Sequence, residues 1–269
     1  MIDEKKVAEI KERALEMCSR ARAGHVTSAF SIAEVVSVLY YEVMRLDPKN
    51  PAWEDRDRFV MSKNHASVIT YPILQDLGFL DPKEEFLANG SKLGIHSKPG
   101  VPGVDFAGGS LGIGIGFACG EAYYAKTKKK DYRVFCVVGD GECYEGSVWE
   151  AFLFAGAKEL NNLVVVIDRN RLCITDFTEN LLPLESLKEK MEAFRFETVE
   201  IDGHDLGAIR GAFARVGAPR QKPLCIIADT IKGHGVDFFE NVPLWHGKAP
   251  VDADAEKAKK QLTEARYGG

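Results

Sequence analysis

Residues 133–172 read RVFCVVGDGECYEGSVWEAFLFAGAKELNNLVVVIDRNRL, and this stretch decides the expected fold. It begins with a short β-rich run over 133–138 and continues through a helical segment over 145–160. It ends in a second apolar run over 163–168. Continuously apolar strands that are separated by helices are typical of a parallel sheet covered on both faces. The stretch therefore predicts an α/β fold with a strand–helix–strand unit at its centre.

The same alternation extends along most of the chain. Apolar residues at three- and four-residue spacing predict helices, and short apolar runs predict further strands. Helices are expected at 3–23, 31–46, 110–128, 205–216 and 253–267, with a helix entry at Asp81-Pro82, and strands at 196–201 and 224–229. Because no internal repeat or low-complexity linker divides the sequence, residues 1–269 are expected to form a single domain, a parallel sheet flanked by helices on both faces.

Composition argues against several classes of protein. The net charge is −5, and no basic block carries interleaved aromatic residues, so a nucleic-acid partner is not expected. The longest apolar runs are too short to span a bilayer, so no membrane segment is expected. The N-terminal segment reads as a charged helix and not as a signal peptide. The six cysteines are scattered without a CxxC pair, which favours reduced thiols in a cytoplasmic protein.

Polar residues follow both apolar strands at the point where each strand ends. Gly139-Asp140-Gly141 closes the first strand, and Asn170 lies just beyond the second. In open parallel sheets ligands bind beyond the carboxyl ends of the strands, so neighbouring strands would bring Asp140 and Asn170 together. A carboxylate and an amide oxygen suit Mg²⁺, which completes its shell with phosphate and water. The helix that starts near Glu145 adds backbone N–H donors for a diphosphate.

A Gly-Asp-Gly turn and an Asn cap also occur without any ligand, because such turns are common. Two such signals at the ends of paired strands make that explanation less favourable. The stretch GDGECYEGSVWEAFLFAGAKELNNLVVVIDRNRL also closely resembles the thiamine diphosphate motif of the transketolase family, which begins with GDG and ends in Asn. The resemblance implies that Asp140, Asn170 and the Leu172 carbonyl ligate Mg²⁺. It also implies that Gly139, Gly141, Glu145 and Ile174 belong to the thiamine diphosphate site.

Four of the six histidines match further motifs of this family. His25 lies in AGH, His65 in DRF…S..HA, His96 in GIHSKPG, and His246 in WHGKAP. The resemblance implies that His25, His65, His96 and His246 are catalytic, and that His65 also contacts the cofactor. Histidine suits this work because it donates hydrogen bonds to sugar hydroxyls and transfers protons near neutral pH. His204 and His234 are interpreted as ordinary structural residues.

The glycine-rich run AGGSLGIGIGFACG matches the family's G.LG.G segment. The resemblance implies that Gly109, Ser110 and Leu111 contact the rings of the cofactor. A dinucleotide fingerprint is not favoured, because the spacing is G-x-G-x-G and no clear strand precedes it.

The resemblance covers residues 3–252 but only the first domain of a full transketolase. It implies that the pyrimidine-binding and C-terminal domains lie on a partner chain, the C-terminal transketolase subunit, in an α2β2 heterotetramer. Glu145 and Glu150 match family glutamates at the contact between copies. The implied reaction transfers a two-carbon ketol unit from a ketose or ketose phosphate to an aldose.

Two alternatives stay open at this point. One is another thiamine diphosphate enzyme, a carboligase or 2-oxo acid enzyme with a specialised substrate, and the other is a non-catalytic cofactor-binding subunit. Three departures from the family pattern are expected near the substrate entrance: the residues that follow His25, Asn64, and the loop 175–177. They put ordinary pentose phosphate substrates in doubt but leave the cofactor assignment in place.

Overall fold

The computed structural model describes residues 1–267, and it contains a five-stranded sheet with the order β1-β2-β3-β7-β6. All neighbouring strands run parallel, as the sequence predicts. The strands are β1 (Arg58–Met61), β2 (Val134–Gly139), β3 (Leu163–Arg169), β6 (Glu197–Asp202) and β7 (Leu224–Asp229). The predicted α/β class is therefore confirmed.

The side chains of β2 explain why this part of the sequence is continuously apolar. Phe135 and Val137 point into the core on one face of the sheet. Val134, Cys136 and Val138 point into the core on the other face. Successive side chains of a strand alternate between faces, so a strand that is buried on both faces has to be apolar at every position.

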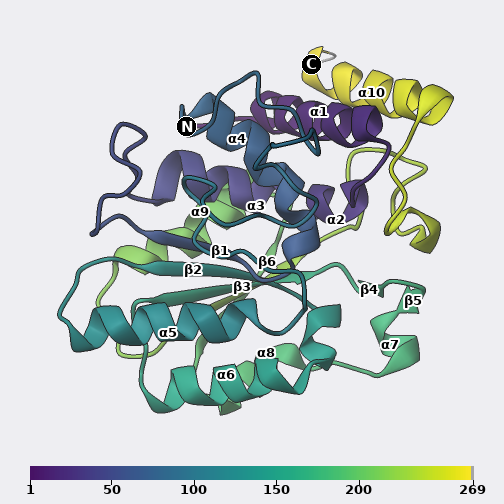
Figure 1. Ribbon diagram of the computed structural model, residues 1–269. Coiled ribbons are helices and arrows are strands. Elements are labelled where there is room, and N and C mark those ends of the chain that lie inside the picture. The colour runs from purple at the N-terminus through teal and green to yellow at the C-terminus, as the bar shows by residue number, and fades with distance from the viewer. Residues whose placement is uncertain (268–269) are drawn as a thin grey trace.

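Helices cover both faces of the sheet (Figure 1). One face is covered by α5 (Gly114–Thr127), α6 (Gly146–Ala157) and α8 (Leu187–Ala193). The layer on the other face contains α1 (Glu4–Ala21), α2 (Val26–Phe30), α3 (Ala33–Val38), α4 (Thr70–Asp76), α9 (Leu206–Ala214) and α10 (Asp252–Tyr267). In Figure 1, α1 and α10 lie side by side, so the first and last helices of the described chain pack together.

A small hairpin extends beyond the carboxyl edge of the sheet. It consists of β4 (Leu172–Cys173) and β5 (Asp176–Phe177), which pair antiparallel, and the one-turn helix α7 (Thr178–Leu181) follows it. The pairing of β2 with β3 sets Gly139 opposite Asp168. This register brings the two predicted strand ends to the same edge, next to the hairpin (Figure 1).

The structure departs from the expected elements in three places. The helix expected over 31–46 is α3 followed by a wider π-turn over 39–43, and the chain bends at Ser31 before it. The Ser31 hydroxyl donates to the Ser28 carbonyl (3.1 Å) and to the Asp168 carboxylate (2.6 Å), which draws the backbone toward the sheet edge. Strand β1 was not predicted, because four residues are too few to show a period.

The helix entry expected at Asp81-Pro82 is wrong. The Asp81 carboxylate accepts a hydrogen bond from the Lys83 backbone N–H (2.8 Å), which closes a turn and starts no helix. The buried Gln75 amide donates to the carbonyls of Asp81, Pro82 and Glu84. These carbonyls are therefore held by a side chain of the preceding helix, which the pattern after Asp81 does not reveal.

Candidate functional site

A cavity of about 250 Å³ opens at the carboxyl ends of β2 and β3. Most of the predicted site residues line it. They are His25, His65, His96, Gly109, Leu111, Gly139, Asp140, Gly141, Asn170, Leu172, Ile174 and His246. Segments from nearly the whole length of the chain therefore converge on one space, as the interpretation of a single site requires.

Asp140 and Asn170 present their oxygens at the sheet edge in a fixed arrangement. The Asp140 carboxylate accepts hydrogen bonds from the backbone N–H of Gly141 (2.7 Å) and of Arg171 (2.6 Å). The Asn170 amide nitrogen donates to Asp168 (2.9 Å), which leaves the amide oxygen toward the backbone N–H of Leu172 (3.1 Å). Burial and the nearby Asp168 carboxylate raise the pKa of Asp140, and Arg169 opposes them.

The four predicted histidines form one cluster around the cavity. The ring centroid of His25 lies 5.2 Å from that of His65, 5.4 Å from His246 and 6.4 Å from His96. Burial, together with neighbouring positive charges such as Lys232, lowers the pKa of His25 to about 4 and that of His246 to about 3. Burial also lowers the pKa of His65 well below its ordinary value. These three rings are therefore uncharged at neutral pH.

Two lysines that the sequence motifs do not single out also line the cavity. The Lys63 ammonium pairs with the buried Asp168 carboxylate and donates to the Ser28 carbonyl (2.8 Å). The Lys232 ammonium donates to the Leu172 carbonyl (3.2 Å) and to Nδ1 of His246 (2.8 Å). Burial and Lys63 lower the pKa of Lys232 to about 8. Both lysines line the cavity in which a diphosphate would lie.

The signal in the sequence for these lysines is their position next to histidine motifs, in SKNH and IKGHG. An isolated lysine reads as a surface residue, since lysine is almost never fully buried unless it is paired. Here Lys63 is 2% exposed and Lys232 is 3% exposed. Only the tertiary arrangement shows that each has an acceptor inside the protein.

A buried glutamate ties the glycine-rich loop to the end of β2. The Glu142 carboxylate accepts from the backbone N–H of Gly112 (2.8 Å) and Gly139 (3.1 Å) and from the Ser62 hydroxyl (2.5 Å). Gly112 has a φ of +81°, and a Cβ there would lie 2.4 Å from the Ser147 hydroxyl oxygen. The loop therefore needs glycine at this position, and Glu142 holds it against the cavity.

Two predicted cofactor contacts do not reach the cavity wall. Ser110 and Glu145 are exposed, and neither lines the cavity. Glu145 occupies the position before α6, where its side chain faces outward, and Glu142 takes the buried place three residues earlier. Glu150 is exposed on the same helix, so both glutamates stay available for contact with another chain.

Of the residues that depart from the family pattern, Ser28 lines the cavity, whereas Thr27 and Asn64 make buried contacts near the histidines. The Asn64 amide donates to the Ser97 hydroxyl (2.9 Å) and accepts from the Ser97 backbone N–H (2.7 Å). The Thr27 hydroxyl donates to the carbonyl of Trp245 (3.0 Å). Both side chains are buried and neither lines the cavity, so they join the histidine-bearing segments and do not shape an entrance.

The cavity also contains polar atoms suited to a bound group. Among residues 1–267, the buried His25 Nδ1 and Ser28 hydroxyl oxygen have no hydrogen-bond partner. Buried polar groups are normally hydrogen-bonded, so these atoms point to a ligand that satisfies them. The oxygens of Asp140 and Asn170, the two ammonium groups and the neutral histidines together fit a magnesium-bound diphosphate with a polar substrate beside it.

The chain matches the family described as "Transketolase, thiamine diphosphate binding domain" over residues 2–266. The chain belongs to the transketolase family. This finding confirms the resemblance and, with it, the thiamine diphosphate-binding character of the domain.

Transketolase relatives fall into two groups by length. The chain is 36% identical to a subunit of the apulose-4-phosphate transketolase of Phocaeicola vulgatus, over 94% of this chain and 91% of that protein. It is 41% identical to the transketolase of Mus musculus, over 97% of this chain but 43% of the mouse protein. The chain thus spans nearly all of the bacterial subunit and less than half of the mouse transketolase.

Solved transketolase structures contain the same domain. The transketolase from Campylobacter jejuni superposes with a TM-score of 0.89 at 32% identity, over 98% of this chain and 43% of that chain. The transketolase from Leishmania mexicana superposes with a TM-score of 0.88 at 30% identity, over 98% and 42%. The predicted sheet with helices on both faces is therefore the transketolase fold.

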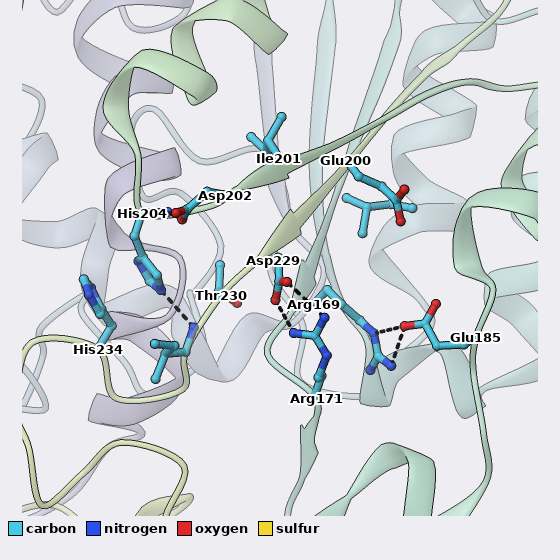
Figure 2. Close-up of a pocket in the computed structure, with 12 residues that line it drawn as sticks. Arg169, Arg171, Glu185, Glu200, Ile201, Asp202, His204, Asp229, Thr230 and His234 are labelled. Atoms are coloured by element: carbon cyan, nitrogen blue, oxygen red, sulfur yellow. Dashed lines mark hydrogen bonds and ion pairs between the residues drawn. The ribbon is translucent and has the colours of Figure 1, made fainter.

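His204 and His234 do not line this cavity but a second pocket (Figure 2). Their rings stack with centroids 3.6 Å apart, and both Nδ1 atoms lie 3.2 Å from the buried Glu34 carboxylate. Three such groups resemble a metal site. However, Lys11 already donates to Glu34 (2.6 Å) and to His234 (3.2 Å).

The tautomer of His204 argues further against a metal there. Its Nε2 accepts the backbone N–H of Ile231 (2.8 Å; Figure 2), so the proton of the neutral ring is on Nδ1, the atom that faces Glu34. A metal on Nδ1 would require the proton to move to Nε2 and would break this bond. The contacts of the pair are therefore those of structural residues, which is how their sequence context was interpreted.

Within residues 1–267, no helix combines the length and the apolar character needed to cross a membrane.

Proposed function

We propose that this chain is the N-terminal subunit of a split transketolase-type enzyme that is active only with a partner chain. The proposed reaction transfers a two-carbon ketol unit from a ketose or ketose phosphate donor to an aldose acceptor. The observation that carries the proposal is the cavity in which Asp140 and Asn170 lie beside four clustered histidines. The match in length to the bacterial transketolase subunit supports the split arrangement.

The proposed ligands of Mg²⁺ are the Asp140 carboxylate, the Asn170 amide oxygen and the Leu172 backbone carbonyl. A few hard oxygen donors of this kind, completed by phosphate and water, suit Mg²⁺. Lys63 and Lys232 would hold the diphosphate oxygens as point charges. Thiamine diphosphate, when bound, supplies the electron sink for carbon–carbon bond cleavage.

The histidines would bind and orient the sugar. A neutral imidazole has one N–H donor and one acceptor nitrogen, so it can donate to one hydroxyl or accept a proton from it. In His246 the acceptor is Nδ1, because Lys232 donates to it, and Nε2 carries the proton. The His25 ring lines the cavity, and we propose that it contacts a substrate hydroxyl there.

We also infer a partner chain and a second copy of this one, in an α2β2 heterotetramer. The outer faces of α5 and α6 carry exposed apolar side chains, which are Ile113, Phe117, Tyr123, Tyr124, Leu153 and Phe154. Contiguous apolar surface of this kind typically marks a protein–protein contact. The start of α6 presents Glu145 and Glu150, and the resemblance implies that the glutamate that activates the cofactor comes from the partner.

The name of the bacterial relative indicates a sugar phosphate substrate for that protein. We propose the same class here, since the cavity adds two lysines to the histidine cluster. The six cysteines are all free thiols, which supports a cellular location in a reducing compartment such as the cytoplasm.

The cofactor assignment is tested with Asp140→Ala in the complex reconstituted with its partner chain. Calorimetry should show that Mg²⁺-dependent binding of thiamine diphosphate is lost, because the variant lacks the carboxylate ligand. Asp229→Asn is the matched control, since Asp229 also ends a strand but pairs with Arg171 at the surface and does not line the cavity. Unchanged affinity in Asp140→Ala, with the fold intact by circular dichroism, would reject the site.

The reaction is tested by supplying the same complex with ketose phosphates, unphosphorylated ketoses and pyruvate in separate assays. Ketol transfer from a ketose to an aldose is the expected result. Turnover of pyruvate with none of any ketose would instead favour a 2-oxo acid enzyme. Cofactor binding without turnover of any donor would favour a non-catalytic subunit.

A further inference from the structure

We propose that Arg169 is a positioning residue that couples the Asp140 carboxylate to the segment 172–185 beyond the sheet edge. The inference rests on the proposed function, because it assigns Asp140 to the metal. It concerns a residue that neither the motif nor the cavity identifies. Arg169 lies between Asp168 and Asn170, at the last position of β3, and it is 2% exposed.

All five N–H groups of the Arg169 guanidinium are used. Nη1 donates to the Asp140 carboxylate (3.0 Å) and to the Thr178 hydroxyl (2.7 Å). Nη2 donates to Glu179 (2.7 Å) and Glu185 (2.8 Å), and Nε also donates to Glu185 (3.0 Å; Figure 2). A planar guanidinium with five fixed donors holds its acceptors in set directions, which a lysine cannot do.

The charges around Arg169 belong to two different parts of the molecule. Asp140 is on the β2 edge and is buried, whereas Glu179 and Glu185 lie on the segment 172–185 and are half-exposed. A buried arginine is stable only when its charge is compensated, and removing one partner of a buried pair is costly. If the segment were displaced, Asp140 would be the only carboxylate left beside the Arg169 guanidinium. The electrostatic attraction between Arg169 and the Asp140 carboxylate would then change.

Other polar contacts also hold the segment. The Lys232 ammonium donates to the Leu172 carbonyl (3.2 Å), and the Lys190 ammonium donates to the Glu185 carbonyl (2.9 Å). The Tyr144 hydroxyl contacts the carbonyls of Thr178 (3.0 Å) and Leu182 (2.9 Å). One end of the segment, residues 172–174, lines the cavity, while Phe177, Leu181 and Leu182 are exposed apolar residues. Arg169 is thus the polar link that joins the Asp140 carboxylate to Thr178, Glu179 and Glu185, so an ordered segment should favour the correct orientation of that carboxylate.

The test measures Mg²⁺ affinity by calorimetry in the reconstituted complex at saturating thiamine diphosphate. Loss of a residue that orients a metal ligand typically weakens metal binding about 10–100-fold. We expect a loss in this range for Arg169→Met. We expect a loss of about tenfold for the double variant Glu179→Gln/Glu185→Gln, which leaves the cavity wall unchanged. Asp229→Asn, which removes the neighbouring Arg171–Asp229 ion pair, is the matched control and should bind Mg²⁺ like the wild type.

Hydrogen exchange of residues 172–185 gives a second readout that does not depend on activity. We expect faster exchange in this segment in both Arg169→Met and the double variant. We also expect slower exchange in the wild type when Mg²⁺ and thiamine diphosphate are added. Arg169→Lys keeps the positive charge but lacks the planar guanidinium, so its Mg²⁺ affinity should lie between those of Arg169→Met and the wild type. This variant replaces Arg169→Met in the test if Arg169→Met does not fold.

The outcomes separate the inference from the function on which it rests. Variants that melt at lower temperature but bind Mg²⁺ with wild-type affinity would overturn the coupling and leave the proposed function in place. A wild-type complex without Mg²⁺-dependent binding would overturn the metal assignment and the inference with it.

Discussion

Two groups of histidines in this protein differ in what surrounds them. In the cavity group, His25, His65, His96 and His246, the rings face open space, and the buried Nδ1 of His25 is unpartnered within the described residues. In the stacked pair, His204 and His234, both rings contact Glu34, and either Lys11 or a backbone N–H holds them further. Within the described residues, Nδ1 of His204 also has no hydrogen-bond partner, so the two groups differ in what the rings face: an open cavity in one and a buried ion pair in the other.

The difference teaches that the surroundings of the ring, an open cavity or a buried ion pair, distinguish the two groups better than burial does. The rings of both groups are half-buried, apart from the exposed His96, and both groups lie near a lysine. In the cavity group the cations Lys63 and Lys232 help to keep the rings neutral, so the rings stay able to accept protons. In the stacked pair the cation Lys11 pairs with Glu34, and both rings lie beside that carboxylate.

The largest expected effect separates the two groups by activity. His65→Ala should lower kcat/KM of the reconstituted complex by about 10²–10⁴-fold, since a positioned histidine contributes about that much to proton transfer. His204→Ala is the matched control, and its kcat/KM per folded molecule should stay close to that of the wild type. Steady-state assays of both variants check this. Equal losses of kcat/KM in the two variants would contradict the proposed difference between the two groups of histidines.

An intermediate effect is expected on stability, in the stacked pair. Glu34→Gln should lower the free energy of unfolding by about 3 kcal/mol, because it leaves the buried Lys11 without its carboxylate. Burial raises the pKa of Glu34, but Lys11 and the two histidines hold it well below its ordinary value, so the charge is present at neutral pH. Urea unfolding measures the change.

The control for this prediction is Glu197→Gln, which removes the exposed pair with Arg215. An exposed pair typically contributes less than about 1 kcal/mol. A comparable loss in the two variants would show that the cluster around Glu34 does not stabilise the fold in the way described.

The smallest expected effect is a dependence of stability on pH that the cavity group causes. The pKa values of His25 and His246 are lowered to about 4 and about 3 in the folded chain, from about 6.5 in the unfolded chain. Between these values the unfolded chain binds protons that the folded chain does not. Stability is therefore full above about pH 6.5 and falls as the pH is lowered toward about 4, by a small amount because solvent screening weakens the effect of these partly exposed rings.

Urea midpoints of the isolated chain at pH 7 and pH 5 measure this dependence. His25→Gln should make the midpoint less sensitive to pH, because the substitution removes one of the titrating groups. An unchanged pH dependence would mean that burial of this ring is not what destabilises the protein in acid.

Much of the fold could be predicted because the central strands are buried on both faces. The runs 133–138 and 163–168 are apolar at nearly every position, and this pattern indicates a parallel sheet without further information. The edge strand β1 was missed because it has only four residues. The helix expected after Asp81 was wrong because the Gln75 side chain, which comes from the preceding helix, holds the carbonyls of that turn.

The candidate site divides in the same way. Asp140, Asn170 and the four histidines could be named from the sequence, since each lies in a motif or at the end of a predicted strand. Ser110 and Glu145 were also named, but they face outward. The catalytic and ligand roles of all these residues stay predictions until the proposed variants are measured.

The sequence by itself determined the alternation of strands and helices and the polar residues at two strand ends, because these depend on neighbours along the chain. Only the tertiary structure decided that Lys63 and Lys232 enter the cavity and that Arg169 joins Asp140 to an outer segment. It also decided that Thr27 and Asn64 tie the histidine segments together. The physical reason is that a buried charge or hydroxyl takes its role from its hydrogen-bonding partners, and in these cases most of those partners come from distant parts of the chain.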